Sequence, residues 1–154
     1  MRQREIHIRK YESADRNKVI ELLRLNTPTY FAPDEEKDLH YYLDNHLENY
    51  FVLETDGQLV GCGGFNTSDR PETIRISWDI IHPEYHGKGL GKELTTFRIQ
   101  QIKTIKGVNT IVVRTSQLVY PFYEKQGFQL REVVQNYWAE GFDLYRMECD
   151  IRSL

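Results

Sequence analysis

The chain has 154 residues, a formal net charge of −3 at pH 7, 40% hydrophobic residues and 28% charged residues. These values are ordinary for a globular protein, so residues 1–154 are expected to form a single domain. A weakly acidic chain gives no general reason to expect nucleic acid or an anionic membrane as a partner, because both attract basic surfaces. The charged N-terminus lacks the apolar region of a signal peptide, and no apolar stretch approaches membrane-spanning length. We therefore expect a cytoplasmic protein without membrane contact.

The two cysteines, Cys62 and Cys149, have no neighbouring cysteine and no cluster of His or Asp at metal-ligand spacing. Both fall in apolar runs that resemble strands. They are therefore expected to be buried thiols with a packing role, and no metal site is expected.

Hydrophobic periodicity predicts the element order β-α-α-β-β-β-α-β-α-β-β, which is typical of an α/β fold with helices on the faces of a mixed sheet. Ser13 or Asp15 is expected to cap the first helix, and Asp56-Gly57 to turn the hairpin. The expected elements are a strand at 5–10, helices at 13–25 and 34–46, a hairpin over 50–65, a strand at 73–82, a helix at 89–105, a strand at 109–115, a helix at 120–126, a strand after Gly127 and a strand at 142–151.

The most informative stretch lies where the strand at 73–82 ends at a proline and a glycine-rich turn leads into a helix. This arrangement directs several backbone N–H groups at one point, beside the positive end of the helix dipole. Gly87, Gly89 and Gly91 allow a ligand to approach the backbone closely, while Lys88 and Lys92 add positive charge. The stretch therefore predicts an anion site, although a glycine-rich helix entry without a ligand is the alternative.

Two common phosphate-binding loops do not fit this stretch. In a nucleotide-triphosphate loop, His86 would replace the first Gly and Glu93 would replace the hydroxyl residue that binds magnesium. In a dinucleotide fingerprint, Lys92 would replace the third Gly. That motif also lies in a βαβ unit at the start of the fold, whereas two predicted helices and several strands precede this stretch.

The run from His86 to Gly91 resembles motif A of the GNAT superfamily of acyl-CoA N-acyltransferases, in which Arg or Gln usually stands where this chain has His86. The resemblance implies a GNAT-like fold with a splayed central sheet, acetyl-CoA as co-substrate, and a pyrophosphate held mainly by backbone amides. The cofactor-binding residues implied in the loop are His86, Gly87, Lys88, Gly89, Leu90, Gly91 and Lys92.

The same resemblance implies that the strand before the loop splays from the strand at Asn109–Arg114 and leaves backbone groups free for the pantetheine arm. Ile80 and Ile81 are the positions expected to present these groups. Both isoleucines also suit a purely packed core, and side-chain burial is compatible with either role.

A second match to the family covers residues 115–128, where Phe122-Tyr123 and Gly127-Phe128 have the expected spacing. Ser116 replaces the usual Asn but keeps a hydroxyl that can bind pantetheine. The resemblance assigns Tyr123 the role of general acid toward the departing CoA thiolate. The alternative is an aromatic ring packed against the sheet.

The implied reaction is direct attack of an amine on the thioester, and Asp79 is the nearest candidate base. Strand alternation places Asp79 on one face with Arg75 and Ser77, but Asp79 also suits an ion pair with Arg75 or another charge. His82 and Glu72 are weaker candidates, and ordered water serves as the base in some relatives.

The acceptor is expected to be a small-molecule or peptide amine, bound between the first two helices and the loop near 136–142. Aromatic and acidic residues in 26–46 suit a cationic amine, or an ordinary solvated helix. Residues 135–138 either line the same cleft or form a homodimer contact. An acyl-CoA sensor without turnover and a structural domain with an empty cleft are the alternatives to an enzyme.

Overall fold

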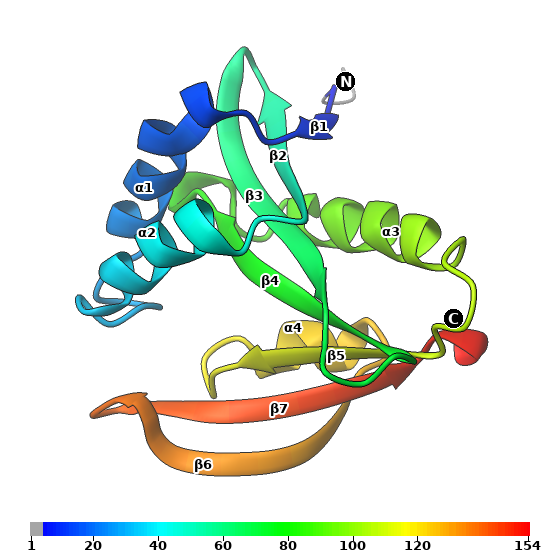
Figure 1. Cartoon of the computed structure of the whole chain (residues 1–154). Coiled ribbons are helices and arrows are strands. Elements are labelled where there is room, and N and C mark those ends of the chain that lie inside the picture. The colour runs from blue at the N-terminus through cyan, green and yellow to red at the C-terminus, as the bar shows by residue number, and fades with distance from the viewer. Residues whose placement is uncertain (1–4) are drawn as a thin grey trace.

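The computed structural model describes residues 5–154, in which seven strands form one sheet in the order β1-β2-β3-β4-β5-β7-β6 (Figure 1). Neighbouring strands are antiparallel except β4 and β5, which are parallel. The strands are β1 (His7–Lys10), β2 (Asn49–Thr55), β3 (Gln58–Thr67), β4 (Thr73–Ile81), β5 (Thr110–Thr115), β6 (Gln129–Ala139) and β7 (Phe142–Asp150). The α-helices are α1 (Arg16–Leu25), α2 (Glu35–Asn45), α3 (Leu90–Ile102) and α4 (Tyr120–Lys125).

The predicted element order is confirmed, and the hairpin turn lies at Asp56-Gly57, where φ is +53° and +72°. The helix predicted to reach Ile105 ends instead at Ile102. A turn follows in which Gly107 has a φ of +87°, so the apolar period there belongs to a turn and not to a further helical turn.

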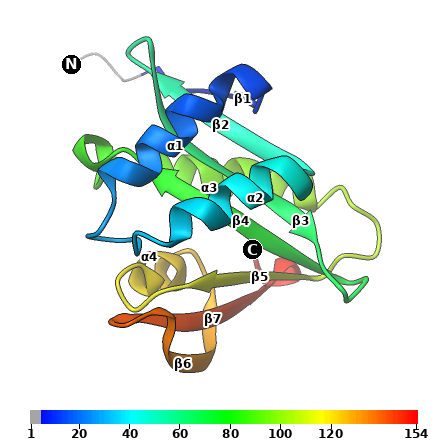
Figure 2. The same ribbon diagram turned by 60° about the vertical axis from the view of Figure 1, so that its left-hand side comes forward.

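Helices cover both faces of the sheet. In Figure 2, α1 and α2 lie in front of the strands and α3 lies behind them. Residues of α1 and α2 pack in one apolar cluster with Val52 and Ile80, whereas residues of α3 and α4 share the other with Met147. Both cysteines are buried, as expected, and neither forms a disulfide.

The two parallel strands separate along their length. β4 pairs with β5 only where Thr73–Arg75 lies beside Thr110–Val112. Beyond this short ladder the strands diverge, as Figure 1 shows, so within residues 5–154 the C-terminal half of β4 has no partner strand on that side. The predicted splay of the sheet is therefore confirmed.

A bulge in β4 changes which way its side chains point. The register with β3 shifts between Cys62 and Gly64, and Trp78 has a φ of +48° at that point. Ser77 faces α2 and bonds to Asn66, but Asp79 faces α3 and α4. The prediction that Arg75, Ser77 and Asp79 share one face was wrong for Asp79, because strict alternation ends at the bulge.

No α-helix within residues 5–154 is long and apolar enough to cross a membrane. The same residues hold no group of three or more His, Cys, Asp or Glu side chains able to bind a metal ion.

Candidate active site

The glycine loop connects the end of β4 to α3 through backbone that only glycine adopts readily. After a short 3₁₀ turn at Pro83–Tyr85, Gly87 and Gly89 have φ values of +73° and +83°. Gly89 directly precedes the first residue of α3. Left-handed backbone costs an L-residue about 1–2 kcal/mol, so the two glycines allow this sharp entry into the helix.

Six successive amides at this entry are available to a ligand. The first helical hydrogen bond of α3 runs from the Glu93 amide to the Gly89 carbonyl. Within residues 5–154, no acceptor is found for the N–H groups from Gly87 to Lys92. Together with the helix dipole, these N–H groups form a site suited to a phosphate oxygen.

The other loop residues have separate contacts. A Cβ atom on Gly91 would lie 3.1 Å from the Phe122 ring, so glycine at this position lets α3 pack closely against α4. The His86 Nε2 atom lies 2.8 Å from the Ile81 carbonyl oxygen, and the His86 ring meets Tyr30 edge-on. His86 therefore fastens the loop to the end of β4.

Ile80 and Ile81 present their backbones in opposite directions. The His82 amide donates to the Val60 carbonyl, so Ile80 and His82 bond toward β3 while Ile81 faces away from it. The Ile81 carbonyl accepts hydrogen bonds on this open side, including one of 3.0 Å from Asn26 Nδ2. The Ile80 side chain is buried in the core beneath α1 and α2.

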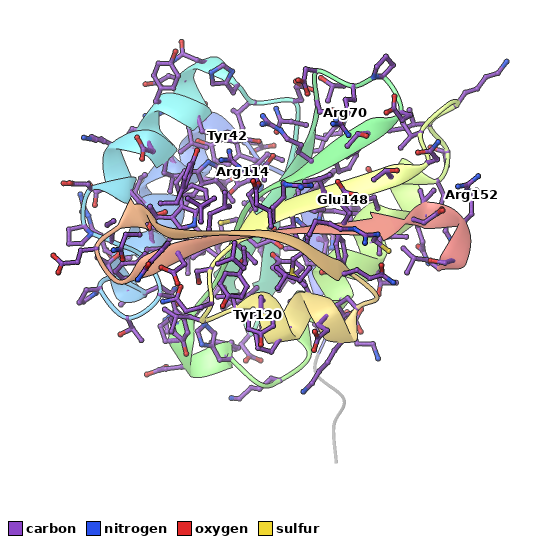
Figure 3. All side chains as sticks on the ribbon, turned by 90° about the horizontal axis from the view of Figure 1, so that it is seen from below. Tyr42, Arg70, Arg114, Tyr120, Glu148 and Arg152 are labelled. Atoms are coloured by element: carbon purple, nitrogen blue, oxygen red, sulfur yellow. The ribbon has the colours of Figure 1, made fainter. Side chains whose placement is uncertain are left out.

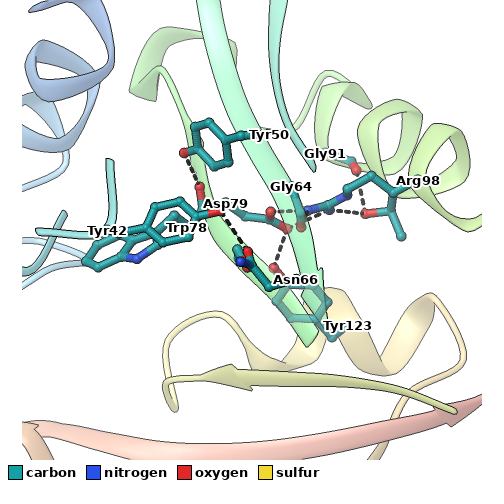
Figure 4. Close-up of polar contacts among 11 residues, drawn as sticks. Tyr42, Tyr50, Gly64, Asn66, Trp78, Asp79, Gly91, Arg98 and Tyr123 are labelled. Carbon is teal, nitrogen blue, oxygen red and sulfur yellow. Dashed lines mark hydrogen bonds and ion pairs between the residues drawn. The ribbon is translucent and has the colours of Figure 1, made fainter. Parts of the chain in front are cut away.

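A buried polar cluster lies beside the point where β4 and β5 separate (Figure 4). Arg98 projects from α3 with no exposed surface and donates to both carboxylate oxygens of Asp79; the Nη2–Oδ2 distance is 2.8 Å. The Tyr123 hydroxyl donates to Asp79 Oδ2 at 2.6 Å. Arg98 Nη1 also donates to the Gly64 carbonyl at 3.1 Å.

The electrostatics of the cluster keep Tyr123 protonated and Arg98 charged. Burial, and then the charge of Asp79, raise the pKa of Tyr123 well above its usual value of 10. Burial alone would lower the pKa of Arg98, but the Asp79 carboxylate outweighs it and the net pKa is raised. The charge that pairs with Asp79 is therefore Arg98, and not Arg75.

Gly63 makes room for this ion pair in the sheet. A Cβ atom at this position would overlap the Asp79 carboxylate and would lie 3.0 Å from Arg98 Nη1. Sequence reasoning missed both Arg98 and Gly63. The signal for Arg98 was its spacing, because it stands four residues from both Leu94 and Ile102 on the buried side of α3.

Ser116 lies buried at the turn between β5 and α4. Its hydroxyl accepts a hydrogen bond of 3.2 Å from the Leu118 amide, and its carbonyl accepts from the amides of Val119 and Tyr120. The residue thereby shapes the start of α4, which carries Tyr123.

One cleft of about 910 Å³ is lined by Asp79, Tyr123, Ser116, the end of β4 and most of the glycine loop. The cleft continues over the sheet to α2 and to the β6–β7 hairpin, where Trp138 lines it. Neither alternative base, His82 or Glu72, lines this cleft among the described residues. His82 instead accepts a hydrogen bond from the Glu84 amide. Other ring-bearing residues along this part of the cleft are Tyr30, Phe31, Tyr41, Tyr42, His46, Trp78 and Phe142.

A splayed mixed sheet with an anion-binding helix start at the end of the splayed strand defines a coenzyme A-dependent acyltransferase. Residues 19–128 match the model of the Acetyltransferase (GNAT) family, and the chain belongs to that family. Enzymes of the family transfer an acetyl group from acetyl-CoA to an amine, so acetyl-CoA is the donor.

Individual relatives agree with this assignment. An N-alpha-acetyltransferase of Sulfurisphaera tokodaii is 25% identical over 96% of this chain and 95% of its own length. An uncharacterized ycf52-like N-acetyltransferase of Prochlorococcus marinus is 37% identical over 57% of this chain; the match spans 49% of that protein. The solved structure of yncA from Salmonella typhimurium, a putative acetyltransferase with acetyl-CoA as its cofactor, shares the fold. Its TM-score is 0.73, at 20% identity over 96% of this chain and 94% of its own.

Proposed function

We propose that this enzyme acetylates a primary amine of a small molecule or peptide by direct attack of the amine on acetyl-CoA. The observation that carries the proposal is the meeting of three features in one cleft: the unbonded amides of Gly87–Lys92, the open edge of β4, and the hydroxyl-bearing cluster at Tyr123. The name of the archaeal relative, which refers to an α-amino group, agrees with an amine acceptor.

The loop binds the diphosphate of the donor through its amide N–H groups, and Lys88 and Lys92 contribute positive charge. The pantetheine arm extends along the side of β4 that has no partner strand, where the Ile81 backbone faces the gap. Ser116 borders the same cleft from the start of α4.

The chemistry requires one new bond and one broken bond. The amine nitrogen attacks the thioester carbon, and the Ile81 N–H stabilises the negative charge that develops on the carbonyl oxygen. The carbon–sulfur bond then breaks, and the Tyr123 hydroxyl hydrogen, which rests on Asp79 Oδ2, rotates toward the sulfur and is transferred to it as a proton. The amine releases a proton to water, and water returns a proton to Tyr123, so the charges balance.

We assign Asp79 to the positioning of Tyr123 and not to the deprotonation of the amine. Both oxygens of this carboxylate already accept hydrogen bonds from the buried Arg98 guanidinium, so they are not directed at the amine. The same carboxylate accepts the Tyr123 hydroxyl and so fixes its orientation. With Asp79 engaged in this way, ordered water takes the amine proton.

Two measurements test the proposed function. Acetyl-CoA is expected to raise the melting temperature, and free thiol is expected to be released when acetyl-CoA is mixed with members of an amine panel. Stabilisation without thiol release from any amine would favour the acyl-CoA sensor. Absence of both effects would overturn the assignment of the donor site.

A further inference from the structure

Two arginines stand at the mouth of the gap between the splayed strands, on the side of the acceptor. Arg75 of β4 lies opposite Val112 of β5, and Arg114 follows two residues later on β5. From strand spacing and rise, their Cα atoms are about 8 Å apart. Both line the cleft, and both are exposed to it.

Their side chains belong to the face of the sheet that α2 covers. Ile111 and Val113 are buried in the core shared by α3 and α4, so Val112 and Arg114 point the other way. Figure 3 agrees, because Arg114 and Tyr42 lie on the opposite side of the β7 ribbon from Tyr120. The two arginines therefore face the acceptor and not the buried Asp79 cluster.

Neither arginine has a carboxylate partner within residues 5–154. Arg114 donates to the Tyr137 hydroxyl at 2.6 Å, and its guanidinium carbon lies 5.0 Å from the centre of the Tyr137 ring and 5.5 Å from that of Trp138. These contacts hold the guanidinium in place and leave further N–H groups unbonded. For Arg75, no ion pair or hydrogen bond of the side chain is present in the described part of the chain.

Four carboxylates line the same cleft, and within residues 5–154 none of them pairs with Arg75 or Arg114. Asp79 pairs with Arg98, and Asp38 forms no ion pair in that part of the chain. Glu48 accepts hydrogen bonds from the Thr67 amide and hydroxyl. Glu35 is buried and accepts one from the Ala32 amide. Two uncompensated guanidinium groups on one wall of a substrate cleft are suited to a carboxylate, whose geometry matches their paired N–H donors.

We propose that Arg75 and Arg114 bind a carboxylate of the acceptor, so that the substrate is a small amino acid, with an amine and a carboxylate in one molecule. This inference rests on the proposed acetyl transfer to an amine. The arginines hold the acid end beside β5, and the amine end lies toward the open edge of β4 near Ile81. The spacing between the two groups selects which amino acid is used.

The test compares acids with their matched amides. Glycine, β-alanine and γ-aminobutyrate are assayed for thiol release beside glycinamide, β-alaninamide and γ-aminobutyramide, which lack the carboxylate. We expect at least one acid to exceed its amide about tenfold or more in kcat/KM, because the amide loses the hydrogen bonds between a charged carboxylate and the arginines. Arg75→Gln and Arg114→Gln are each expected to raise KM for that acid about tenfold and to change kcat/KM for the amide by less than about threefold.

The control is Arg70→Gln, which removes the same charge from an exposed arginine that does not line the cleft. It is expected to behave like the unaltered enzyme, and the melting temperature with acetyl-CoA verifies that each variant folds and binds the donor. Equal turnover of acids and amides overturns the carboxylate site but leaves the acetyltransferase intact. Preference for an aminoalkyl phosphate, or turnover only of peptides with acidic first residues, also overturns it. Thiol release from no amine at all contradicts the proposed function itself.

Discussion

Arg98 reaches Asp79 from the middle of α3 and pairs with it where the arginine has no contact with solvent. Two strands and a helix meet at this ion pair, since Asp79 belongs to β4 and Arg98 also donates to Gly64 of β3. The Asp79 carboxylate in turn accepts the Tyr123 hydroxyl, so the orientation of this proposed general acid on α4 depends on the buried charge of Arg98 on α3.

Loss of the arginine should destabilise the protein strongly. Arg98→Met leaves the Asp79 carboxylate without its buried counter-charge, for which a loss of about 3–5 kcal/mol in the free energy of unfolding is expected. Chemical denaturation measures this change. The double variant Arg98→Met/Asp79→Asn should recover part of the loss, because the uncompensated charge is gone; a single variant within about 1 kcal/mol of the parent would refute the ion pair.

Removal of the Tyr123 hydroxyl should slow the chemical step. Tyr123→Phe is expected to lower kcat about 100-fold or more, while the affinity for acetyl-CoA changes less than about twofold. Tyr120→Phe is the matched control, because Tyr120 lies in the same helix and its ring packs at a tilt against that of Tyr145. The raised pKa of Tyr123 keeps the phenol protonated below pH 10, so its ionisation should cause no loss of activity there. Unchanged kcat in Tyr123→Phe would show that another group protonates the sulfur.

The absence of a side chain at Gly63 should be as important for turnover as the Asp79–Arg98 ion pair that it accommodates. Gly63→Ala is expected to push the Asp79 carboxylate away from Arg98 and to reduce kcat at least about tenfold, because the Tyr123 hydroxyl loses its fixed acceptor. Steady-state kinetics at saturating acetyl-CoA test this. Full activity in this variant would mean that the position of Asp79 has no influence on turnover.

The left-handed glycine before α3 should affect donor binding as well as folding. Gly89→Ala is expected to lose about 1–2 kcal/mol of stability and to raise the Kd for acetyl-CoA about fivefold or more, since the amides shift out of alignment. Gly107→Ala is the matched control, because Gly107 has a similar φ of +87°, open space around it, and no place in the cleft. Titration calorimetry should show weakened binding in Gly89→Ala alone; equal affinities in both variants would argue against the loop as the phosphate site.

Stability should fall at high pH because of a buried thiol. Burial raises the pKa of Cys62 to about 12, from an ordinary value of 9, so the unfolded chain loses this proton first as the pH rises. The contribution of the Cys62 thiol to the free energy of unfolding is complete below pH 9. It disappears between pH 9 and 12, with a slope of up to about 1.4 kcal/mol per pH unit. Cys62→Ala should flatten this part of the unfolding profile, although its cavity lowers stability at every pH. The same slope in both proteins would contradict the assignment to Cys62.

Much of the fold was predictable, because local chemistry dictated it. Asp56-Gly57 turns the hairpin through left-handed backbone that both residues tolerate, and the glycines around Lys88 indicate a tight helix entry. These signals act over a few residues, so a single sequence contains them completely.

The interior of the site was less predictable. A left-handed Trp78 is sterically unfavourable, and the strand around it reads as continuous, so alternation gave the wrong face for Asp79. Arg98 in a helix is usually solvated, and its partner stands 19 residues earlier on another element. Only the three-dimensional packing of β3, β4 and α3 shows that Gly63 leaves room for this pair.

The most direct measurement is a crystal structure of the enzyme with acetyl-CoA. We expect diphosphate oxygens within hydrogen-bonding distance of the amides from Gly87 to Lys92. We also expect the pantetheine arm to lie between β4 and β5 and the sulfur to lie near the Tyr123 hydroxyl. A donor bound elsewhere, with these amides still facing water, would contradict this assignment of the donor site.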